Sequence, residues 1–132
     1  RHRHGTAAPL DVLMQVNVSG EKSKAGMAPD DLAEFLEKSD AFANVEVKGL
    51  MTIPPFTPDA EGAREYFRRL RELRDRYVDG GLAGEFGLSM GMSHDFEVAI
   101  EEGATWIRVG TALFGDRKGS WARAGAVSAD EI

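Results

Sequence analysis

Two short segments near the end of the chain combine residue types that can hold an anion. Leu88–Asp95 (LSMGMSHD) and Arg108–Gly115 (RVGTALFG) each run from apolar residues into a turn of Gly, Ser or Thr. Turns of this composition leave backbone N–H groups free to bind an anion. Each segment predicts a strand end, and two strand ends side by side form a phosphate site. In (β/α) barrels such a site is built from the loops after the last two strands, at their carboxyl ends.

Three small residues in these turns are candidates for binding a phosphate. Ser93 stands where the first segment changes from strand to helix, so its hydroxyl can either cap that helix or face a bound phosphate. Gly110 lets the backbone approach a ligand closely, and Thr111 adds a hydroxyl and an N–H group. The combination favours a phosphate site, with helix capping by Ser93 alone as the simpler alternative.

Arg108 lies between two apolar residues of the second segment and is the candidate for a charged ligand contact. An unpaired buried charge is costly, so its guanidinium needs a partner. The planar fork of an arginine can bind a phosphate or donate to a ring nitrogen. The alternative is a structural ion pair with a glutamate, and the composition does not choose between the two.

Polar side chains also follow the first expected strand. Lys22 and Lys24 can meet an anionic ligand or form a Schiff base, although solvated surface lysines are far commoner. Asn17 alternates with Val16 and Val18, so it faces the other side of the strand and can line a barrel interior or bond to a neighbour. We assign no catalytic role to these residues.

Other catalytic and cofactor motifs do not stand out. His2 and His4 belong to a basic stub, and His94 with Asp95 lacks further ligands at metal spacing, so we expect no metal site. The glycines do not form a dinucleotide fingerprint or a P-loop. The chain has no cysteine, which excludes disulfides, thiolate metal sites and cysteine nucleophiles and fits a cytoplasmic protein.

The composition is that of a globular domain. A chain of 132 residues fits one domain with an apolar core, and 42% hydrophobic with 29% charged residues argues against wholesale disorder. The formal charge of −6 disfavours nucleic acid or an anionic membrane surface as the main partner. No apolar run is long enough to span a bilayer. We therefore expect no nucleic acid and no membrane partner, and the phosphate motifs favour a small-molecule ligand instead.

Apolar runs alternate with helical stretches along the chain. Runs that end at turn residues predict strands over 12–18, 45–53, 86–90 and 106–109. Helices are predicted from Pro29, over 57–78 and over 93–102, with Gly80–Gly81 and Gly103 as stops. The arginine-rich run at 68–76 predicts a salt-bridged helix face. The expected core residues of the helices are Leu32, Phe35, Leu36, Ala63, Phe67, Leu70, Leu73, Tyr77, Phe96, Ala99 and Ile100.

This alternation predicts an α/β fold with a parallel sheet covered by helices. About four βα units fill the chain, whereas a closed eight-stranded barrel typically needs roughly 250 residues. We therefore expect about half of a (β/α) barrel over residues 1–117, followed by a weakly structured tail over 118–132. Its edge strands and inward side chains would lack partners, so we expect self-association through the open sheet edges, partial disorder or marginal stability.

The quoted motifs resemble the YggS/PROSC family of pyridoxal phosphate homeostasis proteins. The similarity runs from about residue 9 to 117, in the order and spacing of that family's carboxyl-terminal half, and its most specific parts are the two segments that end at Asp95 and Gly115. The residues that carry it are Val16-Asn17-Val18, Glu21, Ser23-Lys24, Gly26, Gly49-Leu50-Met51, Leu88 to Ser93, Asp95, Ala99-Ile100, Gly103, Arg108, Gly110-Thr111, Phe114-Gly115 and Arg117.

The resemblance implies a barrel like the amino-terminal domain of alanine racemase, of which this chain holds strands 5–8. It also implies binding of pyridoxal 5′-phosphate without an established catalytic reaction, by a carrier or buffer that serves vitamin B6 homeostasis. Transferred onto this chain, Ser93, Gly110 and Thr111 would hold the phosphate. Arg108 would lie beside the phosphate or the pyridine nitrogen.

The resemblance further implies that Met90 or Met92 packs near the cofactor ring. In that family the aldimine lysine lies on an early strand of the amino-terminal half, and Lys24 matches a different family lysine. We therefore hypothesise a fragment that retains the phosphate subsite and lacks the aldimine lysine.

Two alternatives remain open for the chain's function. One is a pyridoxal-phosphate-dependent racemase or decarboxylase of the related barrel class, which needs a lysine and an acid/base residue from another domain. The other is a structural half-barrel that pairs with a second copy or with a missing half. Amino-acid turnover would favour the first, and an obligate dimer without a ligand effect would favour the second.

Overall fold

A single parallel sheet organises the protein. The computed structural model describes residues 8–22, 25–79 and 86–116. Within these ranges the strands lie in the order β1-β2-β3-β4, with bounds β1 Leu10–Gln15, β2 Val45–Met51, β3 Gly87–Met92 and β4 Trp106–Arg108. The helical segments are η1 Pro29–Asp31, α1 Leu32–Ser39, η2 Ala60–Ala63, α2 Arg64–Asp79, α3 Phe96–Glu101 and α4 Thr111–Phe114. The predicted parallel α/β fold is confirmed.

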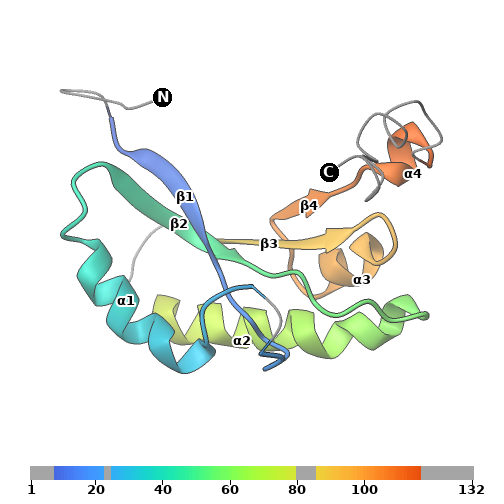
Figure 1. Ribbon diagram of the computed structural model, residues 1–132, viewed down its shortest axis with the longest axis horizontal. Coiled ribbons are helices and arrows are strands. Elements are labelled where there is room, and N and C mark those ends of the chain that lie inside the picture. Colours follow the sequence, from blue (N-terminus) through green and yellow to red (C-terminus); the bar gives the residue numbers. More distant parts are fainter. Residues whose placement is uncertain (1–7, 23–24, 80–85, 117–132) are drawn as a thin grey trace, which may run out of the picture.

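Helices α1, α2 and α3 lie on the same side of this sheet (Figure 1). The apolar side chains between them and the strands form one core. Phe67 and Leu70 of α2 are fully buried there, as are Leu50 of β2 and Leu88 of β3. The rest of the core is made by Val16, Val18, Leu32, Leu36, Ala63, Leu73, Met90, Val98 and Ala99, with Tyr77 partly buried against it. The stripe predicted for the long helix is therefore confirmed.

The helix starts follow from local chemistry. The segment that begins at Pro29 opens as a 3₁₀ turn and continues as α1. Before α2, the side chain of Asp59 accepts a hydrogen bond of 3.1 Å from the amide of Glu61, which caps η2. The predicted stop at Gly80–Gly81 and the tail over 118–132 lie outside the described residues. No helix in the described ranges is both long and apolar enough to cross a membrane.

The orientation of α3 differs from the expectation. Ile100 was expected to face the core, but its side chain is 52% exposed, whereas Val98 and Glu102 are buried. The reason is electrostatic, because Glu102 follows the last turn of α3 and is drawn toward the arginines of α2. Val98 lies four residues before Glu102 on the same helix face, so it turns inward with it.

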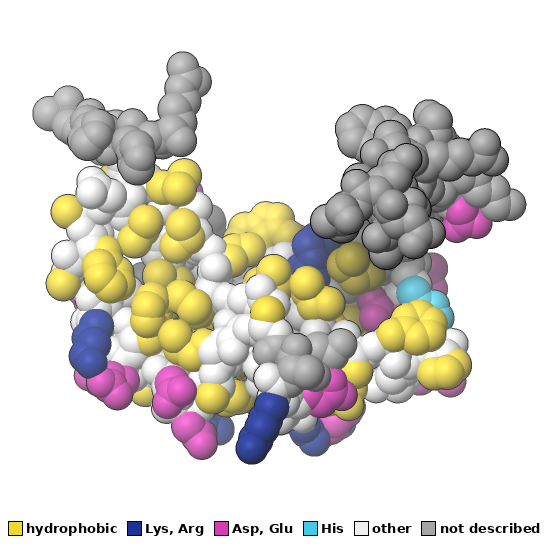
Figure 2. Space-filling view, viewed as in Figure 1, with side chains coloured by type: hydrophobic (Ala, Val, Ile, Leu, Met, Phe, Trp, Pro, Cys, Tyr) yellow, Lys and Arg dark blue, Asp and Glu magenta, His cyan; other side chains and the backbone are white. Residues whose placement is uncertain are grey.

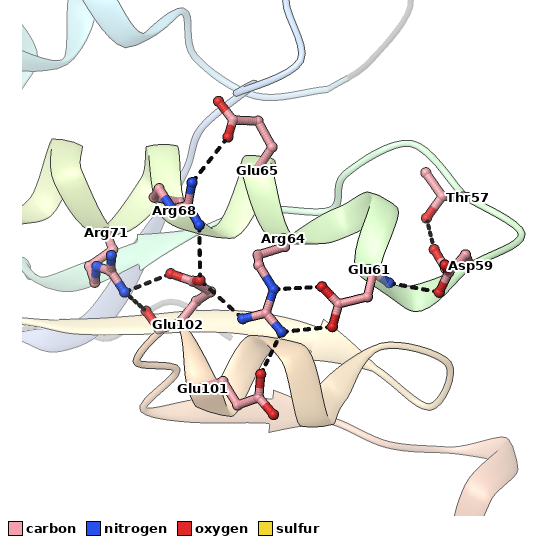
Figure 3. A network of polar contacts seen from close by, with 9 residues as sticks. All are labelled: Thr57, Asp59, Glu61, Arg64, Glu65, Arg68, Arg71, Glu101 and Glu102. Atoms are coloured by element: carbon pink, nitrogen blue, oxygen red, sulfur yellow. Dashed lines mark hydrogen bonds and ion pairs between the residues drawn. The ribbon is translucent and has the colours of Figure 1, made fainter.

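Glu102 is the centre of this ion-pair cluster. Its carboxylate accepts hydrogen bonds from Arg64 at 3.1 Å and Arg71 at 2.6 Å, and Arg68 lies 3.7 Å away. Figure 3 shows the three guanidinium groups reaching from α2 toward this carboxylate. Burial opposes ionisation of Glu102, but the hydrogen bond from Arg64 and the nearby arginine charges outweigh it and lower its pKa.

The arginine-rich run therefore does more than the sequence indicated. Arg69 pairs with Glu65 on the same helix, as expected for a salt-bridged face. Arg64 also binds Glu61 and Glu101, so one guanidinium joins η2, α2 and α3. The cluster ties the α3 end of the chain to the long helix.

The other side of the sheet carries no helix from the described residues. Leu13 is 38% and Trp106 44% exposed, and both line a hollow of about 550 Å³ together with Asp11, Val12 and Lys48. Figure 2 shows exposed hydrophobic side chains over β1 and β2. We call this side the inner face. With β1 and β4 at the two ends of the strand order, the sheet is open, as expected for half of a barrel.

Candidate anion site

The turns after β3 and β4 meet, as the sequence predicted. The hydroxyl oxygen of Ser93 accepts hydrogen bonds of 3.0 Å from the amides of Gly110 and Ala112. The first turn of α4 is thus held by a side chain from the neighbouring βα unit. Ser93 does not cap α3: the N-cap residue is Asp95, whose side chain makes no capping hydrogen bond.

These turns surround an open depression of about 430 Å³, which we call the anion groove. It is lined by Ser93, His94, Thr111, Ala112, Gly115 and Asp116. A Cβ atom built on Gly110 would meet nothing within 4 Å, so the backbone there is open to a ligand. The amide of Thr111 is the first of α4 and has no acceptor among the described residues. Hydroxyls and free amides are the donors that hold a phosphate.

The turn after β3 depends on a glycine in the left-handed region. Gly91 has a φ of +98°, and a Cβ there would lie 2.7 Å from the Cβ of Ala99 on α3. Beyond it, the carboxylate of Asp95 accepts a hydrogen bond of 2.7 Å from the amide of Met92. The close packing of β3 on α3 and this hydrogen bond, which runs from the Asp95 side chain back to an amide three residues earlier, together place Ser93 at the groove.

Arg108 reaches across the sheet from β4. Its guanidinium donates to the hydroxyl of Ser89 at 2.7 Å and to the carbonyl oxygen of Thr52 at 2.8 Å. Burial lowers the pKa of this half-buried group, and the charge of Asp95 partly offsets that effect. The expected alternative, an ion pair with a glutamate, is not found among the described residues. Since its partners are neutral, the positive charge of Arg108 is not cancelled by direct contact.

The two methionines of the first segment lie in different surroundings. Met90 is fully buried and belongs to the core between the sheet and the helices. Met92 is 41% exposed at the carboxyl end of β3, where the turn to Ser93 begins. Strand alternation alone does not predict this difference. Of the two, only Met92 has surface left for a ligand.

Asn17 organises its own loop. Its side-chain amide donates to the carbonyl of Glu21 at 2.7 Å, and its side-chain oxygen accepts from the hydroxyl of Ser19 and the amide of Gly20. The side chain therefore bonds to neighbours. Lys22 is exposed, and Lys24 lies outside the described residues. The described residues contain no group of three or more side chains suited to a metal ion.

Two contacts near the groove were not predicted. The imidazole of His94 bonds to the carbonyl of Thr57 at 2.8 Å, and Arg108 uses Ser89 and Thr52 as partners. These contacts join residues 19 to 56 positions apart, so no local motif could indicate them.

A parallel sheet with helices on one face and polar turns at the carboxyl ends of its strands is the arrangement found in part of a (β/α) barrel. Within that class the chain belongs to the alanine racemase N-terminal domain family, whose family model matches residues 1–118.

Several curated relatives carry the name pyridoxal phosphate homeostasis protein. The protein of Aquifex aeolicus is 56% identical over 108 residues, which cover 82% of this chain and 47% of the relative. That of Pseudomonas aeruginosa is 52% identical over 109 residues, covering 83% and 46%. The human protein is 40% identical over 119 residues, covering 87% and 43%. The resemblance to the YggS/PROSC family is confirmed, and the chain spans about half the length of these relatives.

Solved structures agree with this assignment. PipY of Synechococcus elongatus, without pyridoxal phosphate, gives a TM-score of 0.72 at 36% identity over 81% of this chain and 50% of PipY. PipY with pyridoxal phosphate bound gives 0.67 at 35% identity over 80% of this chain and 49% of PipY. A lysine/ornithine decarboxylase of Vibrio vulnificus, at 17% identity over 75% of this chain and 31% of the enzyme with a TM-score of 0.54, shows the shared fold alone.

Proposed function

We propose that the anion groove is the phosphate subsite for pyridoxal 5′-phosphate, in a protein that carries or buffers this cofactor and does not catalyse a reaction with it. The observation that carries the proposal is the hydroxyl of Ser93, bound to the amides of Gly110 and Ala112 beside the open backbone of Gly110. Support comes from the names of the relatives and from PipY, which was solved with pyridoxal phosphate.

The side chains at the groove suit the parts of the cofactor. Ser93 and Thr111 provide hydroxyls and Thr111 a free amide for the phosphate oxygens, while Gly110, whose amide is bound to Ser93, leaves the backbone beside them open to the ligand. Arg108 would lie beside the phosphate or the pyridine nitrogen, where its uncancelled charge is useful. Met92 would pack near the ring, a role that the buried Met90 cannot take without leaving the core. When bound, the cofactor supplies an electrophilic aldehyde on an electron-withdrawing ring.

The proposal also takes into account that the chain forms only part of a barrel. The inner face and the open edges, β1 and β4, lack the strands that would complete a closed barrel. We infer that the chain holds the phosphate subsite without the lysine that binds the aldehyde. Sodium borohydride reduction of the chain with pyridoxal phosphate, followed by mass spectrometry, should find no site-specific pyridoxyl lysine. A single stoichiometric pyridoxyl lysine would refute this part.

The phosphate subsite can be tested by ligand preference. Pyridoxal phosphate and pyridoxal are titrated against the wild type, Arg108→Ala and Thr111→Val. Thr111→Val removes one hydroxyl at nearly constant shape and should weaken binding of the phosphorylated form roughly three- to tenfold, whereas Arg108→Ala should weaken it by tenfold or more. Binding of pyridoxal should change less in both variants.

Lys38→Gln, on the exposed surface of α1, is the matched control and should leave both affinities unchanged. If the wild type binds pyridoxal as tightly as its phosphate ester, the groove does not hold the phosphate and the proposal fails.

A second role follows from the inner face. Leu13 and Trp106 expose apolar surface that a closed barrel would cover. We infer that this face pairs with a second copy or with a missing half of the barrel. Sedimentation at several protein concentrations should show self-association, independent of ligand. A monomer with sharply cooperative unfolding would contradict it.

A further inference from the structure

A buried serine on the inner face is not explained by the phosphate subsite. Ser89 of β3 lies between Leu88 and Met90, whose side chains are fully buried on the helix-covered side of the sheet. Because successive side chains of a strand alternate, Ser89 points to the inner face. It is only 4% exposed there, although Trp106, its partner residue on β4, is 44% exposed. A buried hydroxyl costs stability unless it is hydrogen-bonded, so its partner indicates its use.

The partner of this hydroxyl is Arg108. In the register of the sheet Arg108 lies opposite Met92, but its guanidinium reaches back along β3 and donates to the hydroxyl of Ser89 at 2.7 Å. A second bond of 2.8 Å goes to the carbonyl oxygen of Thr52, just after β2. The side chain therefore extends from β4 across β3 to the end of β2. Two acceptors on different strands fix both the position and the plane of the guanidinium.

The carbonyl of Thr52 is itself firmly held. Thr52 is 1% exposed, and its hydroxyl donates to the carbonyl oxygen of Val16 at 2.9 Å. Its amide donates to the carbonyl oxygen of Ser89 at 3.1 Å. Thr52 thus links the carboxyl ends of three neighbouring strands. Both acceptors of Arg108 belong to the sheet itself, so the guanidinium is placed before a ligand arrives.

Both acceptors are also neutral. Asp95 acts on Arg108 through space, and its carboxylate is bonded to the amide of Met92. A guanidinium carries more N–H donors than the bonds to Ser89 and Thr52 use, and the others have no acceptor in the described ranges. A carboxylate in the place of Ser89 would cancel the charge. A hydroxyl orients the group and leaves its charge and its spare donors for a ligand.

We propose that Ser89 is a positioning residue of the ligand site, which holds the guanidinium of Arg108 through a neutral acceptor and keeps its positive charge available to an electron-rich atom of the ligand, a phosphate oxygen or the ring nitrogen. The inference rests on the proposed function and deepens it. It concerns how Arg108 is presented and does not involve the turns at Ser93 and Thr111. The alternative is that Ser89 merely satisfies a half-buried arginine and affects stability alone.

The test measures how tightly the full chain binds pyridoxine 5′-phosphate, which has no aldehyde to react with lysines, by calorimetry at one pH. Ser89→Ala removes the acceptor and should weaken binding roughly three- to tenfold, because the guanidinium is no longer fixed. Ser89→Thr keeps a hydroxyl at the same position and should bind within about twofold of the wild type. Ser39→Ala removes a hydrogen-bonded serine hydroxyl from α1, and as the matched control it should leave the affinity unchanged.

Ser89→Asp separates the neutral acceptor from a merely structural partner. Aspartate can still accept from Arg108, so a structural role predicts an unchanged affinity. The proposal predicts that binding weakens by roughly tenfold or more, because the carboxylate cancels the charge of Arg108 and repels the phosphate. Circular dichroism shows whether each variant is folded. If Ser89→Asp does not fold, the double variant decides.

In the Arg108→Ala protein, Ser89→Ala should change the affinity by less than about twofold, because the hydroxyl acts through the guanidinium. An equal loss in both backgrounds, a loss in Ser89→Thr as large as in Ser89→Ala, or a Ser89→Ala protein that binds like the wild type overturns the inference and leaves the phosphate subsite standing. If the wild type binds the phosphate ester no more tightly than pyridoxine, the proposed function fails and the inference fails with it.

Discussion

The two faces of the sheet differ in how completely their apolar side chains are buried. Toward the helices, Leu50, Leu88 and Met90 are fully buried, and the packing is continuous from strand to helix. On the inner face, Leu13 and Trp106 remain partly exposed around a hollow. The same strands supply both faces because alternate side chains point to opposite sides. The contrast shows that, among the described residues, the helix-covered face is a closed core and the inner face is not.

The largest expected effect is on the helix-covered face. Replacing Phe67, which is fully buried, by alanine should lower the free energy of unfolding by about 3–5 kcal/mol, since it removes a ring from a packed core. Urea unfolding followed by circular dichroism measures this. A loss below about 1 kcal/mol would mean that this face is loosely packed and that the contrast between the faces is false.

Glu102→Gln tests the electrostatic part of the same face. The variant leaves Arg64 and Arg71 without their shared buried carboxylate and should cost about 2–3 kcal/mol in unfolding free energy. Glu101→Gln is the matched control, because Glu101 is an exposed partner of the same arginine. Equal losses in the two variants would show that burial of Glu102 is not what gives the cluster its strength.

The same pair of proteins makes a prediction about pH. The pKa of Glu102 is lower in the folded state than its ordinary value of 4.5, because the arginines outweigh its burial. Its contribution to stability is therefore fully present above pH 4.5 and is lost as the pH falls through the lowered pKa. The difference in unfolding free energy between wild type and Glu102→Gln should narrow below pH 4.5. A difference that is constant from pH 7 to acid would refute the assignment.

In β3, whose side chains supply both faces, Gly91→Ala should lower the free energy of unfolding by about 1–3 kcal/mol. Its φ of +98° strains any side chain, and the new Cβ would approach Ala99 to 2.7 Å. Because Gly91 precedes the turn at Ser93, anion binding should weaken together with stability. Gly20→Ala is the control, because Gly20 also has a positive φ but no atom lies within 4 Å of the new Cβ. Its loss of stability measures backbone strain alone, and the additional loss in Gly91→Ala measures the close contact with Ala99.

The smallest effect is expected on the inner face. At a protein concentration low enough to keep the chain monomeric, Trp106→Leu should change the unfolding free energy by less than about 1 kcal/mol, since the ring is 44% exposed. Thermal unfolding at low and high protein concentration measures this change. At high concentration the loss should grow, because the pairing proposal has another polypeptide covering this face; a loss that stays equally small at both concentrations would contradict pairing.

Much of the architecture was predictable from local patterns. Apolar runs that stop at turn residues indicated the four strands found in the described part of the chain, and the spacing of Phe67, Leu70 and Leu73 indicated the buried side of α2. Ser93 and Thr111 were expected to meet, because the ends of neighbouring parallel strands lie at one edge of a sheet. These features depend on short-range periodicity and on one topological rule.

The rest depends on contacts between distant residues. The burial of Val98 in place of Ile100 follows from the attraction between Glu102 and arginines that lie 31 and 38 positions earlier. The partners of Arg108 are the hydroxyl of Ser89 on β3 and the carbonyl of Thr52 just after β2, which no spacing along the chain indicates. The sequence motifs predicted the hydroxyls of Ser93 and Thr111 at the groove. Contacts with distant residues, such as that of His94 with Thr57, could be found only in the structure.

The anion groove is lined by a short, contiguous part of the chain. All of the residues that line it lie within residues 93–116, and the amide-to-hydroxyl contacts that shape it join turns only 17 and 19 positions apart. The contacts of Ser93 with the turn after β4 are therefore specified by one contiguous βαβ module, whereas His94 is also bound to Thr57 outside it. Such a module is a natural unit for transplantation: grafted into another parallel sheet, it should carry with it the phosphate binding that we propose for the groove.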